Sequence, residues 1–231
     1  MRKLGLIGGM SWVSTRTYYE HLNRIVQART SPLASAPLLI ESLDASEMVR
    51  LSTAGEWDHA AQVLAASAQR LEAAGATAIV IGANSMHKVY DRVAAAVSVP
   101  VIHIADCVGK RMAASGVKNA VLLGTSNVML ESFYRQRLVA HGITLVPPVM
   151  DNVAEIDRII YDELMMGKAT RAAERTFKTL ITVMEQAGAE AVVLGCTELE
   201  MVIDVDANVL PIYDGTRIHA EAAADWILGA E

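Results

Sequence analysis

One of the two cysteines in this 231-residue chain stands where a thiol could do chemistry. Cys196 lies between Gly195 and Thr197, at the predicted end of a strand and just before a predicted helix. The positive end of that helix would favour the thiolate, which can act as a nucleophile or a general base. The alternative is a small buried hydrophobic residue, the usual role of a free cysteine. We expect that second role for Cys107, which falls inside a helical stretch.

Four predicted strand ends, that of Cys196 included, concentrate small and polar residues. Their sequences are Gly8-Gly9-Met10-Ser11, Gly82-Ala83-Asn84-Ser85, Gly124-Thr125-Ser126 and Gly195-Cys196-Thr197-Glu198. Each can place backbone N–H groups and hydroxyls at a helix N-terminus, which suits a carboxylate or a phosphate. Ser, Thr and Asn are also ordinary helix caps, but their recurrence at four strand ends favours a shared anionic ligand. Two further loops, 103–106 and 214–219, follow strands and could line the same site.

The elements that must position these residues are short β-branched strands that alternate with longer Ala-rich helices. The predicted strands span residues 4–8, 38–43, 78–82, 99–104, 120–124, 143–146, 191–195 and 209–213. Apolar residues at helical spacing mark the stretches 59–74, 131–140, 153–166 and 171–187. Several strands are apolar throughout, which is typical of strands covered on both faces of a parallel sheet. The alternation predicts an α/β fold.

An internal repeat divides the chain into two similar halves. Residues 75–84 match residues 188–197 position for position, and residues 4–8 resemble residues 120–124. We therefore predict two pseudo-symmetric lobes, 1–103 plus 209–231 and 104–208, each a mainly parallel sheet flanked by helices. Because ligands of such folds bind beyond the carboxyl ends of strands, we expect the active site in the cleft between the lobes. The repeat aligns Cys196 with Ala83.

Charge and composition exclude several classes of protein. The formal net charge of −6 argues against a nucleic-acid binder, which usually has a basic face. No apolar run approaches the ~20 residues of a membrane-spanning helix, and two cysteines cannot build a disulfide framework. We expect a cytoplasmic protein with no membrane or nucleic-acid partner. The sequence also lacks a phosphate-binding loop, a dinucleotide fingerprint, a metal-binding histidine motif and a serine elbow, so we expect no metal.

In their order along the chain, these motifs resemble those of a known family. The resemblance is carried by Gly8-Gly9-Met10-Ser11-Trp12, Asn84-Ser85-Met86-His87, His103-Ile104-Ala105-Asp106, Leu123-Gly124-Thr125, Gly195-Cys196-Thr197-Glu198 and residues 214–219. Together they are similar to the aspartate/glutamate racemases of the Asp/Glu/hydantoin racemase superfamily, over nearly the whole chain. The resemblance implies a cofactor-independent enzyme that binds an acidic amino acid and forms a homodimer.

The resemblance also implies roles for particular residues. In this family two cysteines face opposite sides of the substrate Cα, and one removes the α-proton while the other returns a proton. Cys196 matches one of these acid/base groups. The substrate-binding residues implied in the same way are Met10, Ser11, Asn84, Ser85, Thr125, Thr197 and Glu198.

The chain departs from the family pattern at position 83, where the first acid/base is expected and alanine is found. Alanine carries no exchangeable proton, so the hydroxyl of Ser85 or a bound water would have to serve that face. We therefore predict an amino-acid racemase for aspartate or glutamate that is slow or biased toward one enantiomer. Two alternatives stay open. One is a one-base decarboxylase or isomerase of a small dicarboxylate, which also needs Cys196; the other is a non-catalytic binder of acidic metabolites, which does not.

Overall fold

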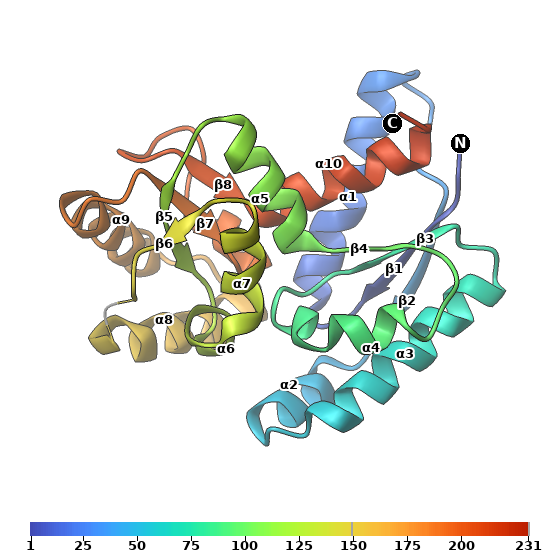
Figure 1. Cartoon of the computed structure of the whole chain (residues 1–231), viewed down its shortest axis with the longest axis horizontal. Helices are drawn as coiled ribbons and strands as arrows, with labels where there is room; N and C mark the ends of the chain where they lie inside the picture. Colours follow the sequence, from blue (N-terminus) through green and yellow to red (C-terminus); the bar gives the residue numbers. More distant parts are fainter. Residues whose placement is uncertain (149, 231) are drawn as a thin grey trace. The chain divides into compact units, whose positions relative to one another are not determined.

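The computed structural model describes residues 1–148 and 150–230, apart from the side chain of residue 151 (Figure 1). The chain forms two compact units, of which the first comprises Met1–His103 with the chain from His219 onward, and the second comprises Ile104–Ile218. Each unit holds one four-stranded parallel sheet between layers of helices, so the predicted two-lobed α/β fold is confirmed. No helix in the described ranges is long and apolar enough to cross a membrane.

The first unit has the strand order β2-β1-β3-β4. Its strands are β1 (Leu4–Gly8), β2 (Leu38–Ser42), β3 (Ala78–Ile81) and β4 (Val101–Ile102), and each neighbouring pair is parallel. Its helices are α1 (Trp12–Arg29), α2 (Ala45–Thr53), α3 (Trp57–Ala73), the 3₁₀ helix η1 (Ser85–Val89), α4 (Tyr90–Ala94) and the part of α10 (Gly215–Leu228) that follows residue 218. In Figure 1, α1 and α10 cover one face of this sheet, and α2 and α3 cover the other.

Side chains alternate along these strands and therefore enter two separate cores. On one face Leu4 and Leu6 of β1 pack with Tyr18 of α1. On the other face Ile7 of the same strand packs with Leu64 of α3. All four aliphatic side chains and the tyrosine are completely buried. Burial on both faces explains why β1 is apolar throughout.

The second unit repeats the plan of the first, with the strand order β6-β5-β7-β8. Its strands are β5 (Asn119–Leu123), β6 (Thr144–Leu145), β7 (Ala191–Leu194) and β8 (Ile212–Asp214), and all pairs are parallel. Its helices are α5 (Ile104–Ala114), α6 (Ser126–Leu130), α7 (Ser132–Ala140), α8 (Met150–Asp162), η2 (Leu164–Met166), α9 (Arg171–Gln186), η3 (Thr197–Met201) and the first turn of α10. Helices α5 and α7 pack on one face, and α8 and α9 on the other.

The internal repeat corresponds to this shared topology. In the first sheet Leu4 of β1 pairs with Ala78 of β3, and in the second sheet Ala120 of β5 pairs with Ala191 of β7. These are the residues that the two sequence alignments match. Strands β3 and β7 thus occupy the same place in their sheets, and position 83 corresponds to position 196.

One predicted boundary is wrong. We assigned all of residues 209–231 to the first lobe, but β8 pairs with β7, with Val192 opposite Ile212 and Leu194 opposite Asp214. Residues 209–218 therefore belong to the second unit, and the chain joins the first unit only from His219. The physical reason is that β8 pairs with β7 as the last strand of the second sheet, just as β4 pairs with β3 as the last strand of the first sheet.

Candidate active site

The first group of predicted site residues comprises Met10, Ser11, Asn84 and Ser85 of the first unit. Met10 and Ser11 follow β1, where the chain turns sharply into α1. Gly9 has a φ of +81°, and an added Cβ would overlap the backbone of Leu43, so only glycine fits between these segments. Ser11 caps α1, because its hydroxyl accepts a hydrogen bond from the backbone N–H of Ser14 (3.3 Å). Met10 is buried in the core on the α3 side of the sheet. Substrate binding by Met10 and Ser11 stays a prediction.

Asn84 and Ser85 follow β3, at the same edge of the first sheet. Ala83 packs in an apolar core with Met10 and Met86, so this position has no group that could carry a proton. Asn84 is 4% exposed, and neither its amide nitrogen nor its amide oxygen has a hydrogen-bond partner among the described residues. Leaving a buried amide unpaired is unfavourable. The Asn84 side chain is therefore suited to hydrogen bonding with a ligand.

The second group of predicted site residues comprises Thr125, Cys196, Thr197 and Glu198 of the second unit, and the last three lie at the carboxyl end of β7. Cys196 is 8% exposed, and its thiol donates a hydrogen bond to Oε2 of Glu198 (3.1 Å). The hydroxyl of Thr197 donates to the same oxygen (2.7 Å). Thr197 and Glu198 are themselves buried at the start of η3. One carboxylate oxygen thus fixes the positions of the thiol and the hydroxyl.

The environment of Cys196 disfavours the thiolate. Burial raises the pKa of the Cys196 thiol well above its usual value, and the charge of Glu198 and its hydrogen bond with the thiol raise it further. The backbone N–H of Glu198 at the start of η3 lowers the pKa, as expected of a helix N-terminus, but burial and the Glu198 carboxylate outweigh it. The helix that follows is a five-residue 3₁₀ helix, and it presents a carboxylate to the sulfur. The Cys107 thiol, in its expected structural place on α5, has its pKa raised by burial to about 12.

Helix α8 adds two residues to the second group that the sequence analysis missed. Oδ1 of Asp157 accepts a hydrogen bond from the backbone N–H of Ser126 (2.8 Å) at the start of α6. Thr125, which precedes α6, is buried and makes no side-chain capping bond; its hydroxyl interacts with Tyr161 instead. Burial raises the pKa of Tyr161 to about 12, the negative charges of Asp157 and Glu198 contribute to the rise, and a hydrogen bond with Thr125 opposes it. The spacing of four residues between Asp157 and Tyr161 is the signal that could have identified them.

Asp106 and Asp214, from the segments 103–106 and 214–219 that were predicted as loops, have structural roles. Asp106 of α5 accepts a hydrogen bond from Arg137 of α7 (2.9 Å) and lies 3.3 Å from Nε2 of His141, the residue that follows α7. These contacts join α5 to α7 within the second unit. Asp214 caps α10, because its Oδ1 accepts a hydrogen bond from the backbone N–H of Thr216 (2.9 Å). Neither contact requires a ligand.

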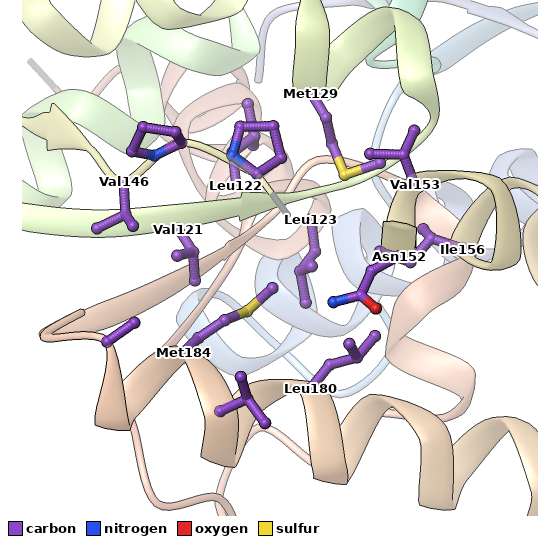
Figure 2. A pocket seen from close by; sticks show the side chains of 14 residues that line it. Val121, Leu122, Leu123, Met129, Val146, Asn152, Val153, Ile156, Leu180 and Met184 are labelled. Carbon is purple, nitrogen blue, oxygen red and sulfur yellow. The ribbon is translucent and has the colours of Figure 1, made fainter. Parts of the chain in front are cut away.

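The second unit also contains an apolar pocket of about 80 Å³ between β5 and the helices α8 and α9 (Figure 2). Aliphatic side chains of these three elements form most of its wall, together with Pro147, Pro148 and the polar Asn152. None of the predicted site residues lines it. We therefore do not assign this pocket to the candidate active site.

Together, the fold and the second group define a class: two-lobed α/β proteins with a buried thiol after the third strand of the second lobe. The chain belongs to the Asp/Glu/Hydantoin racemase family, whose model matches residues 7–223. A solved structure of a candidate Asp/Glu racemase from Yersinia pestis is 39% identical and covers 99% of this chain and 100% of its own, with a TM-score of 0.90.

Two further relatives agree with this assignment. The structure of an aspartate racemase homologue from Pyrococcus horikoshii OT3 is 31% identical, covers 99% of this chain and 100% of its own, and has a TM-score of 0.86. The broad specificity amino-acid racemase RacX of Bacillus subtilis (strain 168) is 24% identical over 161 residues, which are 70% of this chain and 69% of that protein. Membership of the family supports an amino-acid racemase, and hence an isomerase.

Proposed function

We propose that the protein is a cofactor-independent racemase of aspartate or glutamate, in which Cys196 carries the proton on one face of the substrate Cα. The observation that carries the proposal is the buried Cys196 thiol, hydrogen-bonded to Glu198 at the end of β7 in a member of this family. We propose further that the unpaired Asn84 amide binds a polar group of the substrate. Substrate binding by Thr125 stays a prediction.

The hydrogen bond between thiol and carboxylate suggests how the proton moves. Racemisation breaks the Cα–H bond and leaves its electron pair on Cα, from where it delocalises into the α-carboxylate. The resting S–H of Cys196 can protonate that carbanion directly and becomes a thiolate. In the opposite direction the thiol must first lose its proton, and Oε2 of Glu198, 3.1 Å away, is an acceptor within reach. The thiolate then removes the α-proton and becomes a thiol again.

The other face of the substrate has no comparable group, because Ala83 occupies the position that corresponds to Cys196. We propose that the hydroxyl of Ser85, or a water, carries the proton there. A hydroxyl is a far weaker acid than a thiol, and loss of one acid/base typically slows a reaction by 10²–10⁴-fold. Turnover should therefore be slow or biased toward one enantiomer.

A second candidate function follows from the same asymmetry. If a small dicarboxylate loses CO₂, the electron pair of the broken C–C bond stays on carbon, and a proton from one face completes the reaction. The protonated Cys196 could supply that proton, and the inert Ala83 on the other face would not matter. A one-base decarboxylase would give a product without racemising an amino acid.

The test is α-proton exchange in D₂O, followed by NMR and by chiral chromatography. Reduced protein is incubated separately with the L and D forms of aspartate and glutamate. We expect exchange with at least one of them, a loss of at least 10²-fold in Cys196→Ser, and no change in the control variant Cys107→Ser. Exchange retained in Cys196→Ser would contradict the proposed role of the thiol. No exchange with any of the four, together with CO₂ release from a dicarboxylate, would favour the second candidate.

A further inference from the structure

We propose that His87 is a positioning residue of the first group: it fixes the backbone on both sides of Asn84 and so keeps the Asn84 amide available to a ligand. The inference rests on the proposed function for the identity of that ligand, an amino-acid carboxylate. In the sequence, His87 ends the motif Asn84-Ser85-Met86-His87. Its contacts in the first unit give it this more specific role.

His87 makes two hydrogen bonds to successive peptide groups. Its ring nitrogen Nδ1 lies 3.0 Å from the carbonyl oxygen of Ala83, and its backbone N–H donates to the carbonyl oxygen of Asn84 (3.1 Å). A carbonyl oxygen can only accept, so Nδ1 carries the hydrogen. The two carbonyl groups belong to the peptides on either side of the Asn84 Cα. One residue thus restrains both backbone torsions of Asn84.

This restraint explains why Asn84 does not cap the helix that it precedes. Asparagine in that position usually has extended dihedral angles and accepts a hydrogen bond from the first turn with its side chain. Asn84 instead has helical angles (φ −62°, ψ −47°) and makes no capping bond. Its buried amide therefore stays unpaired within the described ranges of the chain. Without the contacts of His87, the amide could turn back onto η1 and become unavailable.

The His87 ring is itself held in place by other rings. It is 2% exposed and is stacked against Tyr90, with 6.5 Å between ring centroids and 9° between ring planes. His103 lies against it at 4.6 Å, and His219 lies edge-on at 5.8 Å. The ring cannot rotate without displacing these neighbours, because side chains in a packed interior have little free space. Nδ1 therefore remains directed at the carbonyl of Ala83.

The second unit shows that the fold does not require an imidazole at this place. The repeat aligns His87 with Glu200 on η3, and the turn from β7 into η3 forms without a histidine. There the residue that the repeat aligns with Asn84 is Thr197, and its hydroxyl donates a hydrogen bond to Glu198 (2.7 Å). A buried side chain that stays unpaired among the described residues at this place is thus particular to the unit that contains His87. This difference favours a role in the site over a role in the fold alone.

Three variants test the proposal through the kinetics of α-proton exchange. His87→Leu removes the ring donor, His87→Asn keeps an N–H near the place of Nδ1, and Tyr90→Phe keeps the ring stacked on His87 and removes only its hydroxyl, without touching the bond to Ala83. We expect KM to rise about tenfold or more in His87→Leu, as for a lost hydrogen bond to a charged ligand, with kcat changed less than about threefold. His87→Asn should restore KM to within about threefold of the wild type.

The control variant separates positioning from stability. Tyr90→Phe removes the hydroxyl that donates to the carbonyl of Val101 (2.9 Å), so its melting temperature should fall while KM stays at the wild-type value. An unchanged KM in His87→Leu would overturn the proposal. So would a KM that follows the melting temperature through all three variants.

A crystal structure of His87→Leu gives a result that does not depend on turnover. We expect Asn84 to adopt extended angles and its Oδ1 to accept a hydrogen bond from the first turn of η1. If Asn84 keeps its helical angles and its unpaired amide, the proposal is wrong. If the wild-type protein exchanges no α-proton from any amino acid, the proposed function fails, and this structure still decides the role of His87.

Discussion

At the scale of single residues, the pair formed by Cys196 and Glu198 sets the chemical state of the candidate site. A thiol beside a cation or at the start of a long helix ionises easily. Cys196 is instead buried beside a carboxylate and keeps its proton. Such a thiol is a ready proton donor, but as a base it needs help in losing its proton. We therefore expect exchange to speed up as the pH rises into the alkaline range, because the thiolate fraction increases there.

Replacing Glu198 with glutamine tests this electrostatic argument directly. The change removes the negative charge and the charged hydrogen-bond acceptor, so the pKa of the Cys196 thiol should fall. Thiolate absorbance or the pH dependence of alkylation measures it, in a Cys107→Ser background so that one thiol reports. Glu200→Gln is the matched control, because Glu200 lies on the same 3₁₀ helix and is not among the groups that shift this pKa. An equal thiol pKa in Glu198→Gln and the wild type would contradict the argument.

At the scale of elements, the connections from strand to helix separate capping from ligand binding. Asn84 and Thr125 both precede a short helix, and neither caps it with its side chain. His87 bonds to the backbone around Asn84, and Asp157 accepts the hydrogen bond from the first N–H of α6. Asp157 thus takes the capping role at α6, whereas the Asn84 amide, unpaired among the described residues, is available for a ligand.

The turn from β1 to α1 gives a prediction at this scale. Gly9 and Gly55 both lie in the first unit with left-handed backbone angles, φ +81° and +72°. An added Cβ at Gly9 would overlap the backbone of Leu43, whereas at Gly55 it would meet open space. We expect Gly55→Ala to lower the free energy of unfolding by about 1–2 kcal/mol, the cost of a left-handed alanine. Gly9→Ala should lower it by more than about 3 kcal/mol, because the backbone must also move.

Urea unfolding followed by tryptophan fluorescence measures both variants. Equal destabilisation in Gly9→Ala and Gly55→Ala would show that the β1–α1 turn can relax without cost. Gly9→Ala should also weaken substrate binding, since Gly9 directly precedes Met10 and Ser11.

At the scale of the whole molecule, the chain leaves the first unit at residue 103 and returns to it at His219. The return is fixed by a buried ring. Nε2 of His219 lies 3.0 Å from the carbonyl oxygen of Ile102, and Nδ1 lies 2.7 Å from the hydroxyl of Tyr18. Because the carbonyl can only accept, Nε2 carries the hydrogen and Nδ1 accepts one from Tyr18. This neutral ring thus connects α10 to β4 and to α1.

The burial of His219 predicts how the stability of the first unit depends on pH. Burial, with a smaller contribution from His87, lowers the pKa of His219 from 6.5 to about 3. Between these values the unfolded chain binds a proton that the native ring does not. Stability therefore falls as the pH falls through this window, and unfolding takes up about one proton at this position. In His219→Gln, which cannot titrate, the pH dependence should be weaker by that proton.

Tryptophan fluorescence isolates the relevant unit, since all three tryptophans, Trp12, Trp57 and Trp226, lie in the first one. Urea unfolding at several pH values between 3 and 7 gives the slope of the unfolding free energy against pH. His141→Gln, in the second unit, is the control and should leave the fluorescence-detected slope unchanged. The same slope in His219→Gln and the wild type would show that another group is responsible.

The sequence by itself determined the features that are encoded over short distances. Runs such as 4–8 and 191–195 identified strands because both of their faces are buried, and the matching of 75–84 with 188–197 predicted two sheets of one topology. Six motifs, from Gly8-Gly9-Met10-Ser11-Trp12 to residues 214–219, together predicted the family. Each single signal lies within about ten consecutive residues, where side-chain periodicity and local backbone chemistry decide the structure.

Tertiary structure alone decided the features that depend on distant partners. β8 joined the second sheet because the edge of β7 pairs with it, not because of its own sequence. Cys196 kept its proton because burial and Glu198 outweigh the field of a short helix. Asp157 and Tyr161 joined the second group because α8 packs against α6, and His87 acts on Asn84 through a ring that three other rings hold. Burial, strand pairing and electrostatic fields are sums over residues far apart in the chain, so no local pattern contains them.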